Sequence, residues 1–220
     1  MLRKLANRIH RGERGITGLE TAIILIAFVV VAAVFAYTAL SAGLFATQKS
    51  QEAVYSGLEE VQSTMTIKGA VIAKAESGHT GADGYISQIT FTVANALSGE
   101  PIDFTEPTGT GDTNGLADSG SDNVVVISYI DEDQRVEDLY WVATPLGDAD
   151  TDDLLEQDEK FQITIGNDTQ TASGGNLFDA LDPNLLVNKQ FTIEIKTPTG
   201  AVMTFERMTP AYIDRVMNLN

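Results

Sequence analysis

Cysteine is absent from this chain of 220 residues, and histidine occurs only at His10 and His79. The chain therefore forms no disulfide, holds no thiolate-bound zinc and has no cysteine nucleophile. It also lacks the G-x-S-x-G, phosphate-loop and H-E-x-x-H motifs, and Gly109-x-Gly111 is no dinucleotide fingerprint because no predicted strand leads into it. These absences predict that the protein is not an enzyme and uses no cofactor.

Basic residues are scarce, since 14 Lys and Arg stand against 31 Asp and Glu, a formal net charge of −17. Such an acidic surface repels polyphosphate, which excludes nucleic-acid binding. The few bases are unevenly placed, because residues 1–15 contain five bases and one acid, a net charge of +4. Residues 16–220 carry the remaining −21. A short basic head before an apolar segment is typical of an exported protein.

Charged residues are missing altogether from Thr21 to Gln48, a run of 28 residues rich in Ile, Val, Phe and Ala. Because about 20 apolar residues cross a bilayer as a helix, this run can span a membrane. A removable signal has an apolar region of only about 7 to 15 residues, although secretory cleavage near Ala39-Leu40-Ser41 is an alternative. Five bases precede the run and three lysines follow within 28 residues. This asymmetry predicts a cytoplasmic amino end and an external remainder.

The helical pattern continues beyond the apolar run, since Val54, Leu58 and Val61 recur at helical spacing. We therefore predict one helix over residues 16–62, about 70 Å long and more than twice the thickness of the hydrocarbon core. Half of such a helix must contact something other than lipid. Its many small residues permit close approach and indicate other helices as the partner: Ala27, Ala32, Ala33, Ala36, Ala39, Ser41, Ala42, Gly43 and Ala46.

The junction Arg14-Gly15-Ile16-Thr17-Gly18-Leu19-Glu20 resembles the processing site of archaeal flagellins (archaellins) and the related type IV pilins. The resemblance continues through the apolar run from Ile24 to Ala36, and again from Leu44 to Gln51. It implies that a prepilin-type membrane peptidase cuts between Gly15 and Ile16, so residues 1–15 are a basic leader and the helix is retained. The residues expected to take part in assembly are Gly18, Glu20, Ala32, Ala33, Ala36 and Gly43.

Glu20 has two interpretations. Its carboxylate can lie at the lipid headgroups in the first helical turn, where the helix dipole favours a negative group. By resemblance to pilins, an acid at the fifth mature position meets the free α-amine of a neighbouring subunit, and cleavage after Gly15 makes Glu20 the fifth residue. Because a charge in mid-membrane costs about 2.5 to 3.5 kcal/mol, such pairing would help to draw the helix out of lipid.

After Gln62 the apolar period changes from 3.6 to 2, which indicates strands. Apolar and polar residues alternate over Ile89–Val93, Phe161–Ile165 and Phe191–Lys196. Four more strands are predicted at Met65–Ala73, Val124–Ile130 (covered on both faces), Leu139–Ala143 and Ala201–Phe205, the last reached through a type I turn at Thr197–Gly200. These seven strands predict an antiparallel β-sandwich or barrel over residues 63–220, and with the helix an α+β fold.

Two polar segments of this outer domain have the spacing of a modification or ion site. Asn167-Asp168-Thr169 is an N-x-S/T sequon that follows a predicted strand, so Asn167 is a predicted glycosylation site. Asp148, Asp150, Asp152 and Glu159 mimic the spacing of a calcium loop, but Asp153 replaces the required glycine. We interpret residues 148–159 as a solvated acidic loop and predict no metal.

Together these features predict a structural filament subunit. By resemblance to archaellins, the filament is the archaellum used for swimming, and the partners are further copies, sibling archaellins, the peptidase and the archaellum motor and assembly machinery. The precursor is expected in the cytoplasmic membrane with its amino end inside, and the mature subunit on the cell surface. Two alternatives stay open: an adhesive type IV-like pilin, and a single-pass membrane-anchored binding domain.

Overall fold

A computed structural model describes the backbone of residues 2–62, 64–96, 100–109, 113–166, 174–199 and 202–219. Side chains are described in the same ranges, except for residues 2–17 and 59–62. The chain divides into two compact units, residues 1–55 and 56–220. The first unit is helical, and the second contains every strand of the described chain.

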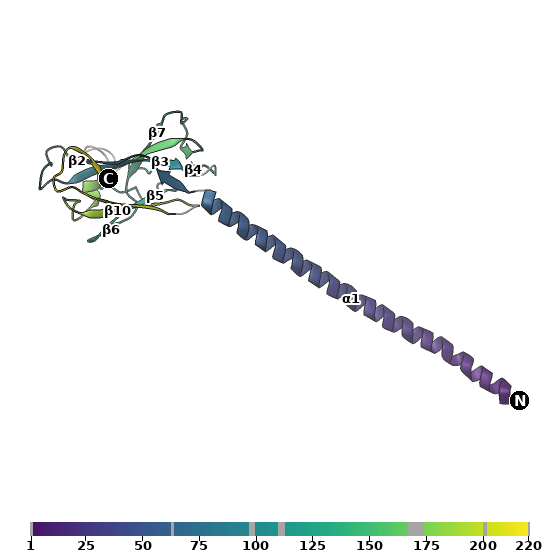
Figure 1. Cartoon of the computed structure of the whole chain (residues 1–220). Helices are drawn as coiled ribbons and strands as arrows, with labels where there is room; N and C mark the ends of the chain where they lie inside the picture. Colours follow the sequence, from purple (N-terminus) through teal and green to yellow (C-terminus); the bar gives the residue numbers. More distant parts are fainter. Residues whose placement is uncertain are drawn as a thin grey trace. The chain divides into compact units, whose positions relative to one another are not determined.

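Helix α1 runs from Leu2 to Gln62 without interruption (Figure 1). Its end agrees with the predicted one, but the predicted start at Ile16 was wrong, because the helix begins within the basic head. Residues 2–15 contain no proline and are rich in Leu and Arg, which favour helix. Gly12 and Gly15 each cost only about 1 kcal/mol in a helix interior and do not end it.

The outer domain is built from twelve strands and one short helix, α2 (Leu177–Ala180). The strands are β1 Met65–Ile67, β2 Val71–Ala75, β3 Ile86–Asn95, β4 Ile102–Asp103, β5 Val126–Asp131, β6 Arg135–Val136, β7 Trp141–Leu146, β8 Leu154–Leu155, β9 Lys160–Ile165, β10 Gln190–Lys196, β11 Met203–Met208 and β12 Val216–Leu219. A six-stranded sheet has the order β12-β2-β3-β9-β7, with β1 also paired to β3. A four-stranded sheet has the order β11-β10-β5-β6, and β4 pairs with β8. All these pairings are antiparallel.

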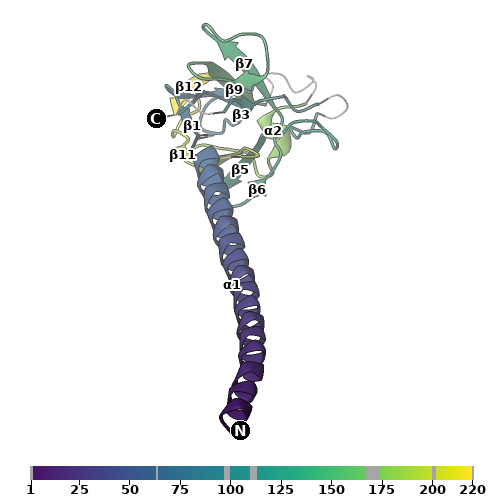
Figure 2. The same ribbon diagram turned by 90° about the vertical axis from the view of Figure 1, so that its right-hand side faces the viewer.

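The two larger sheets pack face to face as a sandwich (Figures 1 and 2). Phe91 of β3 and Phe205 of β11 meet edge to face with ring centroids 5.0 Å apart, so the two sheets share one core. In the same core, the Phe104 ring lies 5.8 Å from that of Trp141 and 5.9 Å from that of Phe161. The predicted α+β fold with an antiparallel sandwich is thus confirmed.

Some predicted strands were wrong in detail. The single strand predicted at Met65–Ala73 is broken into β1 and β2, because Gly69 has a φ of +82° and cannot continue an extended strand. The strand predicted at Val124–Ile130 begins only at Val126, and it is not fully covered on both faces, since Val126 and Ile130 are only partly buried.

Other boundaries shifted by a few residues. The strand predicted to begin at Leu139 begins at Trp141, and Leu139 forms an isolated bridge with Leu116. The predicted hairpin between β10 and β11 is present, although Gly200 and Ala201 of its predicted turn lie outside the described residues. The two-residue strands β4, β6 and β8 are too short to show any alternation, and β12 was also missed.

Candidate assembly helix and surface sites

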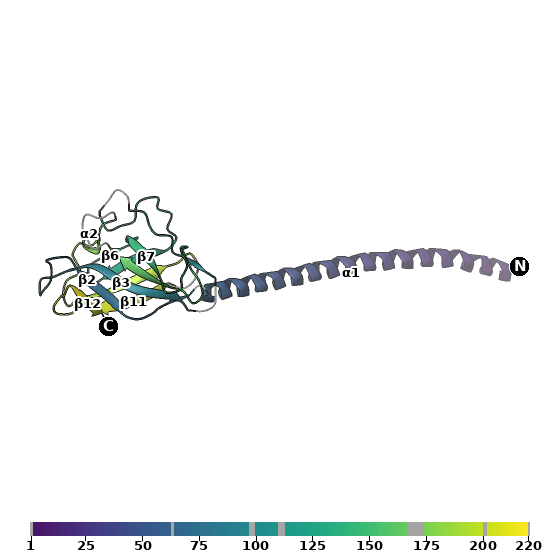
Figure 3. The same cartoon turned by 90° about the horizontal axis from the view of Figure 1, so that it is seen from above.

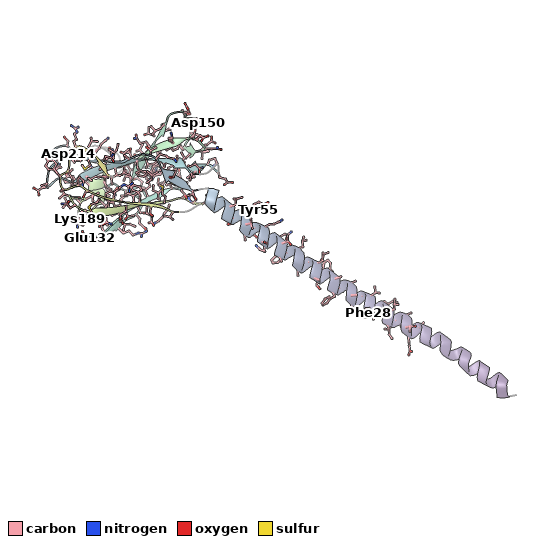
Figure 4. All side chains as sticks on the ribbon, viewed as in Figure 1. Phe28, Tyr55, Glu132, Asp150, Lys189 and Asp214 are labelled. Atoms are coloured by element: carbon pink, nitrogen blue, oxygen red, sulfur yellow. The ribbon has the colours of Figure 1, made fainter. Side chains whose placement is uncertain are left out.

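The described side chains of α1 are exposed throughout, from Gly18 to Leu58. Phe28 and Phe35 are 76% and 75% exposed, and the same segment is long and apolar enough to cross a membrane. Figure 4 shows Phe28 and Tyr55 projecting from the helix. Burial of a large apolar side chain is worth about 1.5 to 3 kcal/mol. An apolar surface of this extent cannot stay in water and requires lipid or other helices.

The hydroxyl groups of three threonines in the apolar segment donate to carbonyl oxygens of the helix itself. Thr21 donates to the carbonyl oxygen of Gly18, Thr38 to that of Phe35 and Thr47 to that of Gly43, over 2.9 to 3.1 Å. An unsatisfied polar group in hydrocarbon costs several kcal/mol, so these bonds let the helix enter an apolar environment. An ion pair between Lys49 and Glu52 marks the end of the uncharged run.

Four of the predicted assembly residues share one side of α1. With about 100° of rotation per residue, Gly18, Ala32, Ala36 and Gly43 fall within a sector of about 40°, whereas Ala33 lies about 100° from Ala32. A Cβ atom added at Gly18 or Gly43 meets nothing within 4 Å in the chain. The space beside these residues is therefore open to a second helix.

The predicted processing residues Arg14, Gly15 and Ile16 lie within the helical backbone of α1, and their side chains are outside the described residues. Glu20 is exposed on the same helix. The predicted glycosylation site Asn167 also lies outside the described residues, which resume at Gly174 after β9 and Gly166.

The acidic loop, residues 148–159, is held by its own carboxylates. Glu159 accepts the backbone N–H groups of Asp150 and Glu156 over 3.1 and 3.0 Å. Asp150 and Asp152 accept those of Asp152 and Leu154 over 3.0 and 2.9 Å. In the described part of the chain, no group of three acids or histidines is arranged to hold a metal ion. These carboxylates therefore shape the loop backbone.

Among the described residues, His79 lies in an aromatic stack. Its ring centroid is 4.5 Å from that of Tyr85, which stacks in turn on Phe178 at 4.4 Å. Burial, followed by the charges of Glu76 and Asp179, raises the pKa of Tyr85. His79, Tyr85 and Phe178 thus form a packed aromatic cluster.

The carboxylate of Asp131 in the outer domain accepts several hydrogen bonds. It accepts the Tyr129 hydroxyl and the backbone N–H groups of Asp133 and Gln134, each over 2.8 Å. Burial alone would raise the pKa of Asp131, but these hydrogen bonds together hold it below its ordinary value. On the same side of the sandwich, hydrogen bonds to Glu132 and Asp133 raise the pKa of Lys189 (Figure 4).

A surface feature that the sequence did not indicate is a hollow between Lys74 and Arg215. The two residues are far apart in the chain, and the antiparallel pairing of β2 with β12 brings them together. No periodic pattern or motif could have revealed this pair.

Known proteins are similar to this chain over most of its length. A model of the archaeal-type flagellin family matches residues 15–207. The chain belongs to the archaeal-type flagellin family. Probable flagellin 1 of Archaeoglobus fulgidus is 38% identical over 217 residues, which cover 96% of this chain and 98% of that flagellin. Probable flagellin 2 of the same archaeon is 35% identical over 211 residues, which cover 93% and 94%.

A solved flagellin filament has the same fold. The structure of the archaeal flagellum of Methanospirillum hungatei matches with a TM-score of 0.59 and 28% identity, covering 92% of this chain and 98% of that one. The likeness thus includes both the long helix and the sandwich. The family match begins at Gly15, so the basic head falls almost entirely outside the shared region.

Proposed function

We propose that this chain is a structural subunit that polymerises through α1 into the archaellum filament used for swimming. The observation that carries the proposal is the exposed apolar surface of α1 from Gly18 to Leu58, joined to a separately folded acidic domain. Flagellin relatives that match nearly the whole chain, and the fold shared with the flagellum of M. hungatei, support it. As a flagellin, the chain is a structural protein.

Packing of α1 against the same helix of other copies would drive assembly. The hydrophobic effect supplies no net force between helices already in lipid, so the gain comes from close van der Waals contact and lipid release. The shared side of Ala32, Ala36 and Gly43 offers such close contact, because it presents little side-chain volume. The outer domain, whose core is complete within residues 65–219, would then face the external solvent.

Maturation would precede assembly. The precursor would enter the cytoplasmic membrane with its basic head inside, because bases are concentrated before the apolar run. A prepilin-type peptidase would then cut between Gly15 and Ile16 and free the α-amine of Ile16. The archaellum motor and assembly machinery, and possible sibling flagellins, would be its partners at the cell surface, and a glycan would be carried on Asn167.

The amino terminus of sheared filaments tests this function. Filaments are sheared from cells, collected by centrifugation and sequenced; Ile16 is the expected first residue. Deletion of the gene should abolish swimming. An adhesive pilin would instead lose surface attachment, and a monomeric anchor would give single chains in detergent extracts and no filaments. A mass spectrum of the peptide that contains Asn167 shows whether the expected glycan is present.

A further inference from the structure

The six-stranded sheet differs in charge from the rest of this acidic chain. None of its six strands contains Asp or Glu, whereas β5, β10 and β11 of the four-stranded sheet each contain one. On the side of the four-stranded sheet, Arg135 and Lys196 contact Glu194, and Lys189 contacts Glu132, whereas Arg207 of β11 donates to the carbonyl oxygens of Leu219 and Glu206. The two sheets therefore offer different surfaces to a partner.

At one end of the six-stranded sheet, Lys74 and Arg215 line a hollow of about 270 Å³, which we call the basic hollow. It is built by the backbone, since Lys74 lies opposite Val216 and the N–H of Ala75 donates to the carbonyl oxygen of Arg215 over 3.1 Å. Its lining contains no acid: Lys74, Ala75, Ser77, Ser87, Arg215 and Val216.

Neither cation of the basic hollow is neutralised within the described chain, because no carboxylate oxygen lies within 4.0 Å of Lys74 or Arg215. Two acids are neighbours in sequence but do not line the hollow. Glu76 accepts a hydrogen bond from Asn176 over 3.1 Å, and Asp214 is exposed. Two unpaired cations in an acidic protein indicate an anionic partner.

Beside the basic hollow, one buried oxygen atom accepts no hydrogen bond. Lys74 borders a second hollow together with Gln88, which is only 5% exposed. The side-chain nitrogen of Gln88 donates to the carbonyl oxygen of Gly166, but the side-chain oxygen has no partner in the described chain. A buried polar atom without a partner costs about 1 to 3 kcal/mol, and a backbone N–H from outside would reach this oxygen only if the Gln88 side chain turned outward.

The acidic loop is the complementary surface. It contains seven acids and no base between residues 148 and 159, and none of these acids forms an ion pair with a described cation. The acidic loop joins β7 to β9 and lies at the opposite end of the sheet from the basic hollow. Lys160, which follows the loop, pairs with Ala94 near the end of β3. Lys74 of the basic hollow pairs instead with Gln88 near the start of β3. Asp150 and Asp214 accordingly lie at opposite ends of the domain in Figure 4, and Figure 3 shows β2, β3 and β12 side by side.

We propose that the acidic loop of one copy docks in the basic hollow of the next copy. Carboxylates of the loop would pair with Lys74 and Arg215. Because the two surfaces differ and lie at opposite ends of one sheet, the contact is head to tail, and a contact of this kind builds a helical filament when the rotation between copies does not close a ring. The inference rests on the proposed filament function, since assembly is what brings outer domains together.

Charge reversal followed by charge exchange tests this contact in cells. The double variant K74E/R215E should lower the yield of sheared filament about tenfold, because two intersubunit pairs become repulsive. Adding D148K/D153K to the same chain should restore most of the yield, because these two loop acids, unlike Asp150 and Asp152, hold no backbone N–H group of the loop. The control K189E/K196E makes the same change in charge beside the other sheet and should retain nearly full yield; because it also breaks ion pairs to Glu132 and Glu194, urea denaturation of both double variants first checks that their outer domains are equally stable. Equal loss in both double variants, or no rescue, would overturn the proposal.

Cross-linking supplies an independent readout, because the chain has no native cysteine. Filaments of S77C/D150C should give a ladder of oligomers on a non-reducing gel after mild oxidation. Filaments of S77C/T204C, whose second thiol lies on the exposed face of β11, should give none. Intact filaments without a ladder would overturn the head-to-tail contact yet leave the filament function standing. Wild-type cells without filaments would instead refute the function itself. If the cysteine variants do not assemble, the charge-exchange series decides.

Discussion

At the scale of single residues, Asp131 holds the connection between β5 and β6. The Tyr129 hydroxyl and two backbone N–H groups all use its carboxylate as acceptor. Tyr129 is fully buried, and burial, together with its bond to Asp131, raises the pKa of its hydroxyl. Loss of the carboxylate would leave a buried donor without an acceptor, which is among the more costly changes in a protein.

Asp131→Ala is therefore expected to lower the free energy of unfolding of a chain of residues 64–220 by about 2 to 4 kcal/mol. Urea denaturation followed by circular dichroism measures the change. The neighbouring Glu132→Ala removes only an exposed partner of Lys189 and should cost less than about 1 kcal/mol. Similar losses in the two variants would show that Asp131 is an ordinary surface acid.

The contribution of Asp131 should also depend on pH. Its pKa is lower in the folded chain than in the unfolded chain. The stabilisation is therefore fully present above the ordinary pKa of about 3.9 and is lost as the pH falls through the folded value. The difference in unfolding free energy between the native chain and Asp131→Asn should shrink from about pH 6 to about pH 3. A difference that is constant over this range would contradict the assignment.

Glu20 is the residue at which membrane insertion and assembly are expected to separate. Glu20→Ala removes a charge that costs about 2.5 to 3.5 kcal/mol in mid-membrane, so insertion should persist. The yield of filament should fall, because the α-amine of Ile16 in a neighbouring copy loses its partner. Membrane fractionation and filament yield measure the two effects. Filaments of normal length would leave Glu20 with a role at the headgroups alone.

At the scale of elements, α1 presents the exposed apolar surface available for assembly, and the strands form the core of the folded domain. The small residues near the middle of α1 are unnecessary for an isolated helix, where Gly43 costs about 1 kcal/mol relative to Ala. Nothing in the chain itself lies within 4 Å of a Cβ at this position. If Gly43 is retained for close packing, the cost must be recovered in contact with another helix.

A size series at Gly43 tests this explanation. Filament yield is expected to fall in the order Ala, Val, Leu, because each added methyl group separates the packed helices further. Membrane insertion should be unchanged in all three variants, since each substitution is apolar. Filament yield and the thermal stability of sheared filaments are the measurements. A flat series, or an increase from Gly to Leu, would mean that lipid faces this side of the helix.

At the scale of the whole molecule, the net negative charge destabilises the compact state that the fold stabilises. The sandwich brings most of the chain's excess negative charge onto one compact domain, and seven acids lie together in the acidic loop. Like charges repel over a Debye length of about 30 Å at 0.01 M salt and about 3 Å at 1 M. The compact state is therefore penalised most at low ionic strength.

The midpoint of thermal unfolding of residues 64–220 should accordingly rise between about 0.01 M and 1 M sodium chloride. The triple variant D148N/D153N/D158N lowers the charge of the loop and should flatten this dependence. Sucrose at matched osmolarity controls for effects of excluded solute. A midpoint that does not respond to salt would show that self-repulsion is unimportant.

Residue pattern alone predicted the long helix, its end at Gln62 and the antiparallel strands at β3, β9 and β10, because side-chain periods of 3.6 and 2 are local properties. It failed where backbone conformation at one residue decided the outcome, as at Gly69. It also missed β4, β6 and β8, which are too short to show a period. The helix start at Leu2 was missed because the processing motif suggested a boundary that the backbone does not have.

By itself, the sequence determined that the chain has a long apolar helix and an acidic outer domain, since composition and periodicity can be read directly from the order of residues. The tertiary structure alone decided which charges are paired. Lys74 and Arg215 meet through the pairing of β2 with β12, and the acidic loop lies at the other end of the same sheet. Such non-local contacts depend on strand order and register, which no local pattern encodes.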